Sequence, residues 1–181
     1  MLHFIYKYFL CIRMTINTIL SKKSDNKNKI KKLLGIRSKS RALGCICSSI
    51  DVTDDFLEWL SFCDADFVVF KDISEMKKYD NIYHVFQEDV QKTLSGFDFF
   101  ICNGETKDIQ GLLKEGVIPI VYKKNYLSSL LQEFNPIKWE GNCFLFDSEN
   151  KWSMYASVVK YLENYKFPYD NKNLVKNTVQ I

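Results

Sequence analysis

The sequence predicts one α/β domain on a mostly parallel sheet of about six strands, with helices on both faces. Three observations predict this fold. Short apolar runs alternate with segments of helical spacing, an order typical of βαβ units. Hydrophobic residues make up 46% of the 181 residues, including 14 Phe and 10 Tyr, which is enough for a sizeable core. Only 7 Gly and 3 Pro occur, which argues against a turn-rich all-β fold.

Six apolar runs are predicted to form the strands of this sheet. In chain order they are Ala42–Ile46, Ala65–Phe70, Asn81–Phe86, Asp98–Cys102, Val117–Tyr122 and Asn142–Phe146. A continuous apolar run such as the second is typical of a strand buried on both faces. We therefore expect the domain to cover residues 41–181, and any ligand to bind beyond the carboxyl ends of the strands.

Helical spacing between the apolar runs predicts the helices. The first follows the cap residues at 52–55, where Phe56, Leu57 and Leu60 recur at helical intervals. The others are expected at Glu88–Leu94, Lys107–Lys114, Tyr126–Phe134 and Lys151–Tyr165. The last is the longest, and its apolar residues lie on one stripe.

Residues 1–40 form a leader whose charge differs from that of the rest. Residues 1–41 hold eleven of the 25 Lys and Arg residues but only Asp25 of the 22 acidic residues, which leaves 14 basic and 21 acidic residues for the remainder. This acidic balance argues against nucleic acid as a partner of the main domain. The leader is expected to be a flexible arm or an interfacial helix on an anionic membrane surface. The Lys-, Asn- and Ser-rich stretch Ser21–Arg41 predicts a linker, within which Lys29–Leu34 can form a short basic helix.

The cysteines indicate the compartment. None of the six forms a C-x-x-C pair, and most lie inside apolar runs, where Cys behaves as a small buried hydrophobe. Only His3 and His84 accompany them, so no metal site is expected. Free thiols in a core indicate a reducing cytoplasm. We therefore expect a cytoplasmic protein, held peripherally at a membrane if the leader binds lipid.

One loop is the candidate ligand site. It follows the predicted strand Asp98–Cys102, opens a helix, and consists of Asn103, Gly104, Glu105, Thr106, Lys107 and Asp108. Free amides at a helix start suit a phosphate, Thr106 and Lys107 can add to its binding, and Glu105 or Asp108 can accept from a sugar hydroxyl. Helix capping explains the same residue types equally well. Both interpretations remain open.

Other motifs of known chemistry are missing. Neither G-x-G-x-x-G nor G-x-x-x-x-G-K-[ST] occurs, which argues against a dinucleotide fingerprint and a P-loop. The pair Ser48-Ser49 can donate to a phosphate, but such a pair is more often a polar turn. Lys123-Lys124 can reach an anion or form a solvated turn. With no G-x-S-x-G or H-E-x-x-H motif, no catalytic residue can be named.

Three segments carry a family resemblance. They are the aspartate-led run Phe97–Phe100, the Gly-to-Pro segment Gly116–Val121, and the later run Gly141–Phe146. In this order, residues 81–167 resemble the C-terminal half of group-1-type GT-B glycosyltransferases. The resemblance implies a Rossmann-like domain that binds a nucleotide-sugar donor for hexosyl transfer. It also implies an acceptor side supplied by a partner chain or a second copy, because a leader of about 40 residues is too short to be an acceptor domain.

The resemblance also implies positions for donor contacts. The family spaces two acids as E-x7-E, and counting back from Pro119 places them at Asn103 and Gly111, neither of which is acidic. Residues 47–53 contain no basic residue for a diphosphate. Two functions therefore remain open: the donor-binding domain of a sugar-transfer enzyme, or a non-catalytic binding or interaction module derived from one. No cofactor is expected. A receiver-like domain is disfavoured because Gln87 follows the third predicted strand.

Overall fold

The structure, a computed structural model, contains the parallel sheet that the sequence predicts. It describes residues 2–38, 41–86, 90–103, 109–124, 130–147 and 150–181, with only the backbone of residues 2–15 and Gln91. Six strands, all parallel, lie in the order β3-β2-β1-β4-β5-β6. Their bounds are β1 Ala42–Ile46, β2 Ala65–Val69, β3 Ile82–His84, β4 Phe99–Cys102, β5 Ile118–Tyr122 and β6 Phe144–Phe146. The predicted fold class is confirmed.

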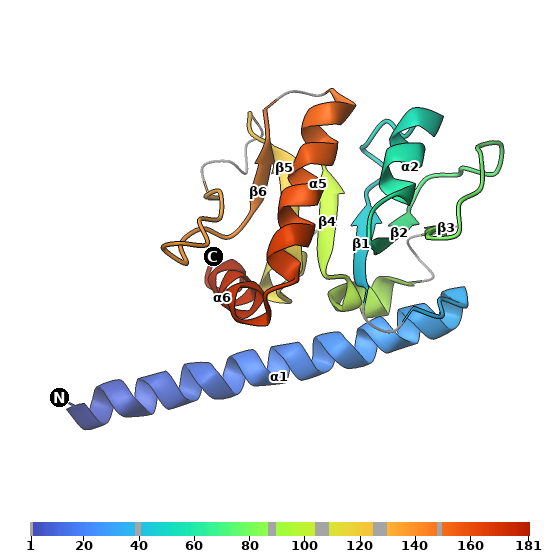
Figure 1. The fold of residues 1–181 in the computed structure, drawn as a ribbon. Helices are drawn as coiled ribbons and strands as arrows, with labels where there is room; N and C mark the ends of the chain where they lie inside the picture. Colours follow the sequence, from blue (N-terminus) through green and yellow to red (C-terminus); the bar gives the residue numbers. More distant parts are fainter. Residues whose placement is uncertain (1, 39–40, 87–89, 104–108, 125–129, 148–149) are drawn as a thin grey trace.

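Helices cover both faces of the sheet (Figure 1). One face is packed by α2 (Asp54–Ser61), α5 (Lys151–Tyr165) and α6 (Pro168–Thr178). The other is packed by the 3₁₀ helix η1 (Gln91–Gly96) and α4 (Ile109–Lys114). These are the two layers that a parallel sheet needs to bury both of its faces.

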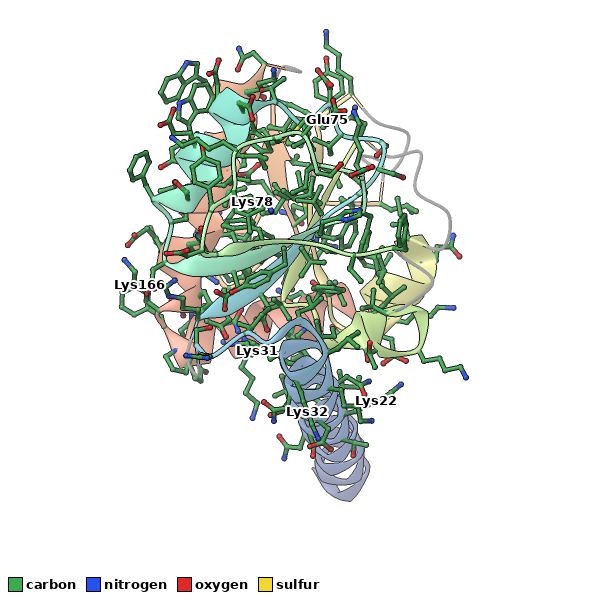
Figure 2. The ribbon with its side chains drawn as sticks, turned by 90° about the vertical axis from the view of Figure 1, so that its right-hand side faces the viewer. Lys22, Lys31, Lys32, Glu75, Lys78 and Lys166 are labelled. Atoms are coloured by element: carbon green, nitrogen blue, oxygen red, sulfur yellow. The ribbon has the colours of Figure 1, made fainter. Side chains whose placement is uncertain are left out.

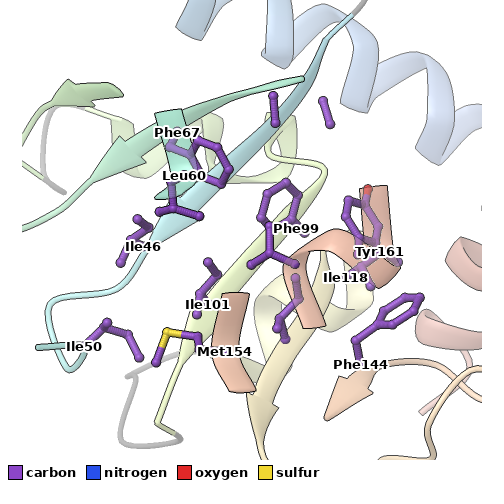
Figure 3. Close-up of a cluster of buried hydrophobic side chains, with 14 of the residues drawn as sticks. Ile46, Ile50, Leu60, Phe67, Phe99, Ile101, Ile118, Phe144, Met154 and Tyr161 are labelled. Carbon is purple, nitrogen blue, oxygen red and sulfur yellow. The ribbon is translucent and has the colours of Figure 1, made fainter. Parts of the chain in front are cut away.

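Aromatic side chains fill the core on the α5 face (Figure 3). The rings of Phe67 and Phe99 meet edge to face with their centroids 5.9 Å apart. Tyr161 of α5 packs against Phe99 at 4.7 Å and against Phe144 of β6 at 5.7 Å. Aromatic pairs of this kind add about 0.5–1.5 kcal/mol beyond the area that they bury. They tie α5 to the central and edge strands alike.

Residues of the GT-B-like segments have structural roles. Gly116 ends α4 with a φ of 71°, a conformation that favours glycine. Pro119 lacks a backbone N–H, but this costs no hydrogen bond to β6, because the pairing of β5 with β6 begins only at Ile120. Gly141 has a φ of 91°, and a Cβ there would lie 2.3 Å from the Glu133 carbonyl oxygen. These residues shape the fold and carry no chemistry of their own.

The helix α1 (Leu2–Leu34) corrects one prediction. It includes most of the predicted linker Ser21–Arg41 and runs beneath the domain, across the amino ends of the strands (Figure 1). Ile30 of this helix is fully buried. A Cβ on Gly96 of η1 would lie 2.5 Å from the backbone of Asn26, so the two backbones are in close contact. The linker prediction is therefore wrong for residues 21–28, whereas the short basic helix expected at Lys29–Leu34 is part of α1.

Lysines of α1 bind acidic groups at this amino edge. Lys27 forms an ion pair with Asp98 at 2.5 Å, and Asp98 also accepts a hydrogen bond from the Leu43 amide at 2.8 Å. Lys31 lies 3.7 Å from Asp66, and burial lowers the pKa of Lys31. Figure 2 shows α1 nearly end-on, with Lys31 where the helix meets the domain. The basic leader thus supplies partners for buried acids of the domain.

The remaining predicted helices agree with the structure only in part. Of the predicted helix Glu88–Leu94, Glu88 and Asp89 lie outside the described residues, and the rest is helical, from Val90 into the 3₁₀ helix η1. Of the predicted helix Tyr126–Phe134, residues 126–129 lie outside the described ranges. The described residues 130–134 are not helical, and Glu133 bridges to Cys143. The helix α6 was not predicted, because it is polar apart from its buried Leu174 and Val175.

Among the described residues, no helix is long and apolar enough to cross a membrane. The membrane contact expected of the leader, residues 1–40, stays a prediction.

Candidate ligand-binding site at the carboxyl edge of the sheet

The strand order locates a candidate site between β1 and β4. These two strands are neighbours, and the chain leaves β1 toward β2 on one side and β4 toward β5 on the other. In open parallel sheets, ligands bind in the crevice beyond the carboxyl ends of the strands at such a reversal. Ser48 and Ser49 follow β1 here, and Asn103 follows β4.

Hydrogen bonds connect the two loops at this point. The Asn103 side-chain amide donates to the Ser49 carbonyl oxygen at 3.1 Å, and its backbone N–H donates to Ser49 Oγ at 3.5 Å. A turn closed by Ile50 N–H and the Cys47 carbonyl oxygen, 3.0 Å apart, fixes the β1 loop. Asn103 is half-buried, whereas Ser48 is exposed. The two loops are therefore fixed to each other, and Ser48 beside them is exposed to solvent.

Of the six residues predicted to form the ligand site, the structure describes one. Asn103 lies at the strand reversal, bonded to Ser49. Gly104, Glu105, Thr106, Lys107 and Asp108 lie outside the described residues, so their part in phosphate or sugar binding stays a prediction. The helix that this loop opens, α4, begins at Ile109.

Charged residues at the same edge form exposed ion pairs. Lys71, after β2, lies 3.8 Å from Asp51, and Lys123, after β5, lies 3.2 Å from Asp147. Ion pairs between exposed groups contribute little, about 0–1 kcal/mol. Because these pairs separate at low cost, both lysines are available to a bound anion.

The thiols and the histidine do not add to the site. Cys45, Cys47, Cys102 and Cys143 are buried, and burial raises the pKa of the Cys143 thiol. In the part of the chain that the structure describes, no three His, Cys, Asp or Glu side chains are arranged to hold a metal ion. His84 is half-buried in the edge strand β3.

A cavity that the sequence did not predict lies elsewhere. About 540 Å³ in volume and open to solvent, it is lined by residues of β6, α5, the start of α6 and the loop before β6, two strands away from β4. The signal in the sequence was a cluster of aromatic residues within polar stretches. Trp139, Phe167 and Tyr169 are all exposed near it.

Comparisons with known proteins agree with this fold. No protein-family model matches the chain. The glycogen synthase of Fervidobacterium nodosum is 24% identical over 194 residues, which cover 93% of this chain and 39% of that protein. The catalytic domain of starch synthase IV from Arabidopsis thaliana, solved with ADP and acarbose, superposes with a TM-score of 0.68 at 18% identity. That match covers 88% of this chain and 39% of the starch synthase chain.

The chain has the fold of one half of a GT-B glycosyltransferase. The spinosyn forosaminyltransferase SpnP also matches, with a TM-score of 0.50 at 13% identity over 82% of this chain and 41% of its own. The chain thus spans about two fifths of the length of the relatives that it matches. The resemblance to the C-terminal half, inferred from Phe97–Phe100, Gly116–Val121 and Gly141–Phe146, is confirmed.

Proposed function

We propose that this GT-B half binds a nucleotide-sugar donor in the crevice between the carboxyl ends of β1 and β4, as the donor side of a sugar-transfer enzyme. The observation that carries the proposal is the Ser49–Asn103 connection, which fixes two polar loops at the strand reversal. Fold alone does not assign a function. The proposal therefore depends on the chemistry of these loops.

Each group near the crevice has a role in this proposal. The exposed Ser48 hydroxyl donates to the donor diphosphate. Lys71 and Lys123 leave their weak surface pairs and offset its charge. Thr106 and Lys107, in the loop that continues from Asn103, add a hydroxyl and a positive charge. Stabilising the charge of a leaving diphosphate is how an enzyme of this kind lowers its barrier.

Asn103 occupies the position of a donor-binding acid in the resembling family. A neutral amide both donates and accepts, so it still bonds to sugar or ribose hydroxyls but contributes no charge. We therefore propose that this chain binds the donor, and that transfer also requires an acceptor side that residues 1–181 do not supply. The ADP in the starch synthase IV structure supports an ADP-linked sugar as the first donor to test.

Thermal unfolding with nucleotide sugars tests donor binding. A ligand at 100 times its Kd stabilises a protein by about 2.7 kcal/mol, which for a chain of this size raises Tm by roughly 5–10 °C. ADP-glucose, UDP-glucose, a GDP-sugar and a CDP-sugar would be compared with free glucose. The absence of a shift with every one of the four would refute the donor site.

Two variants separate binding from stability. Asn103→Ala removes the amide from the crevice and should weaken donor binding at least tenfold, while the lost hydrogen bond costs only about 0.5–1.5 kcal/mol of stability. Asn28→Ala is the matched control, because Asn28 is exposed on α1 at the opposite edge of the sheet. If both variants bind the donor equally well, Asn103 does not contact it.

A further inference from the structure

The cavity at the β6 edge has a largely aromatic lining. The residues that form this lining are Phe134, Pro136, Phe144 and Phe167. Its volume of about 540 Å³ falls within the range of small-molecule sites, about 300–1,000 Å³. It shares no residue with the crevice between β1 and β4, so it is a separate place for a ligand.

An unpaired amide lies in the wall of this cavity. The Asn164 side chain of α5 lines the cavity and is only 8% exposed. Neither its Nδ2 nor its Oδ1 has a hydrogen-bond partner among the described residues. Leaving buried polar groups unpaired costs about 1–3 kcal/mol each, so such a group calls for an explanation. Neighbouring side chains cover both atoms, so a ligand must displace them to reach the amide.

Trp139 is held at the rim in a strained conformation. Its φ of 56° is rare for a bulky residue and costs on the order of 1–3 kcal/mol. Its indole N–H donates to Asp170 of the cavity at 3.1 Å, and its carbonyl oxygen accepts from the Asn177 side chain at 2.9 Å. The ring meets Tyr169 edge to face at 5.2 Å, yet it is still 48% exposed. These contacts hold an exposed aromatic ring in one fixed place.

The charges around the cavity favour a neutral ligand. The lining of the cavity includes three acidic residues, Glu133, Glu163 and Asp170, and one basic residue, Lys160. This excess of negative charge repels an anion. A cation is also disfavoured, because Lys160 lies 3.6 Å from Glu133 and Lys166 lies 2.7 Å from Glu163. A purely apolar ligand would leave Asn164 unpaired. An anion, a cation and a purely apolar ligand are therefore each disfavoured by one observation.

We propose that this cavity, with Trp139 at its rim, binds a neutral oligosaccharide. Pyranose rings present C–H faces that pack on aromatic rings, and their hydroxyls both donate to carboxylates and exchange hydrogen bonds with an amide. Asn164 and Asp170 supply those polar partners, and Trp139 and Phe167 supply the rings. Saccharide binding itself does not depend on the proposed donor site, whereas a role in holding the acceptor of sugar transfer does.

Isothermal titration calorimetry of the full chain with maltopentaose tests this site. Trp139→Gly removes the ring, and glycine accepts the positive φ without strain. Asn164→Leu removes the amide at similar volume and should leave stability equal or higher. We expect both variants to bind maltopentaose at least tenfold more weakly. Trp152→Ala is the matched control, since Trp152 is another exposed tryptophan, stacked on Trp59, and this variant should bind like the wild type.

The remaining outcomes also decide the question. No binding of maltopentaose by the wild-type chain at about 10 mM, where even a weak saccharide site with a Kd in the millimolar range would respond, would overturn the proposal. So would unchanged binding in Trp139→Gly and Asn164→Leu. Competition by choline, which would reveal a cation site, also contradicts it. Ser48→Ala should leave maltopentaose binding unchanged, so that a loss in this variant would move the saccharide to the carboxyl edge. Donor-induced shifts in Tm should persist in Trp139→Gly, so the two proposals fail independently.

Discussion

The two edges of the parallel sheet are built in opposite ways. At the amino edge, α1 closes over the strand ends, and the buried acids there have half-buried or buried lysines as partners. At the carboxyl edge, Ser48 is exposed, and the ion pairs formed by Lys71 and Lys123 lie at the surface. Burial makes the first set of contacts important for stability, whereas exposure leaves the second set free to bind a ligand. The polar groups of one sheet thus serve two different purposes.

The amino edge also explains the uneven charge of the chain. Lys23, Lys27 and Lys31 recur at intervals of four residues and form one stripe of α1 that faces the domain. Burial alone lowers the pKa of Lys27, but the Asp98 carboxylate and the Tyr165 hydroxyl outweigh it and raise the pKa. Part of the positive charge of the leader is therefore used within the protein and is not available to a membrane or a nucleic acid.

Asp98→Ala should have the largest effect on stability. Asp98 and Lys27 have side chains only 8% and 14% exposed, and removal of one partner of a buried pair costs about 3–5 kcal/mol. The Leu43 amide also loses its acceptor. Urea unfolding would measure the loss, with Asp64→Ala as control, since Asp64 forms only an exposed pair with Arg41. Equal losses in the two variants would contradict the structural role of the amino edge.

Lys23→Met should remove a pH dependence of stability. Burial lowers the pKa of Lys23 to about 8, below the 10.5 of the unfolded chain. The folded protein therefore loses this proton first, and its stability rises by about 2 kcal/mol between pH 7.5 and 9.5. The variant should lack this rise in urea unfolding. The measurements stay below about pH 10 because burial raises the pKa values of Tyr161 and Tyr165. Above that pH these tyrosines ionise more readily in the unfolded chain, which lowers the stability of the folded protein.

That rise must be measured as the difference between the wild-type chain and Lys23→Met. Lys32→Met serves as control, since Lys32 is exposed on the same helix. A parallel pH profile for the wild type and Lys23→Met would show that Lys23 keeps an ordinary pKa in the folded protein.

The strands could be predicted from sequence because a strand buried on both faces is a continuous apolar run. Each run from Ala42–Ile46 to Asn142–Phe146 contains an observed strand. The docking of α1 could not be predicted, because its stripe of lysines looks like a solvated face until distant acids such as Asp98 and Asp66 are placed beside it. The extended segment before β6 was predicted as a helix for a similar reason. The Asn142 side chain accepts from the Gln132 amide at 2.9 Å, a contact between residues ten positions apart.

The candidate site was predicted only in part, for physical reasons. The position of Asn103 followed from the rule that ligands bind beyond the carboxyl ends of strands, but its bond to Ser49 depends on which strands are neighbours. The β6-edge cavity depends on how α5, α6 and the loop around Trp139 pack together. Neither the positive φ of Trp139 nor the unpaired amide of Asn164 leaves a mark in the sequence.

Lys22→Ala should have a small effect, although Lys22 is on the same helix as Lys23 and Lys27. It lies 2.6 Å from Glu115, but the two side chains are 55% and 37% exposed, so their pair should contribute only about 0.2–1 kcal/mol. Any loss should shrink further in 1 M salt, where screening acts over about 3 Å. Urea unfolding at low and high salt measures both. A loss as large as that in Asp98→Ala would mean that burial does not determine the strength of these pairs.

Ser48→Ala should have the smallest effect on stability and still weaken donor binding. Ser48 is exposed at the carboxyl edge, where substitutions usually change stability by no more than about 0.5 kcal/mol. Its hydroxyl is the group that we expect to contact the diphosphate, so the donor-induced rise in Tm should fall while the Tm without ligand stays the same. Ser24→Ala, exposed on α1, is the control. A lower Tm without ligand would show that the carboxyl edge, like the amino edge, serves stability; this would remove the contrast between the two.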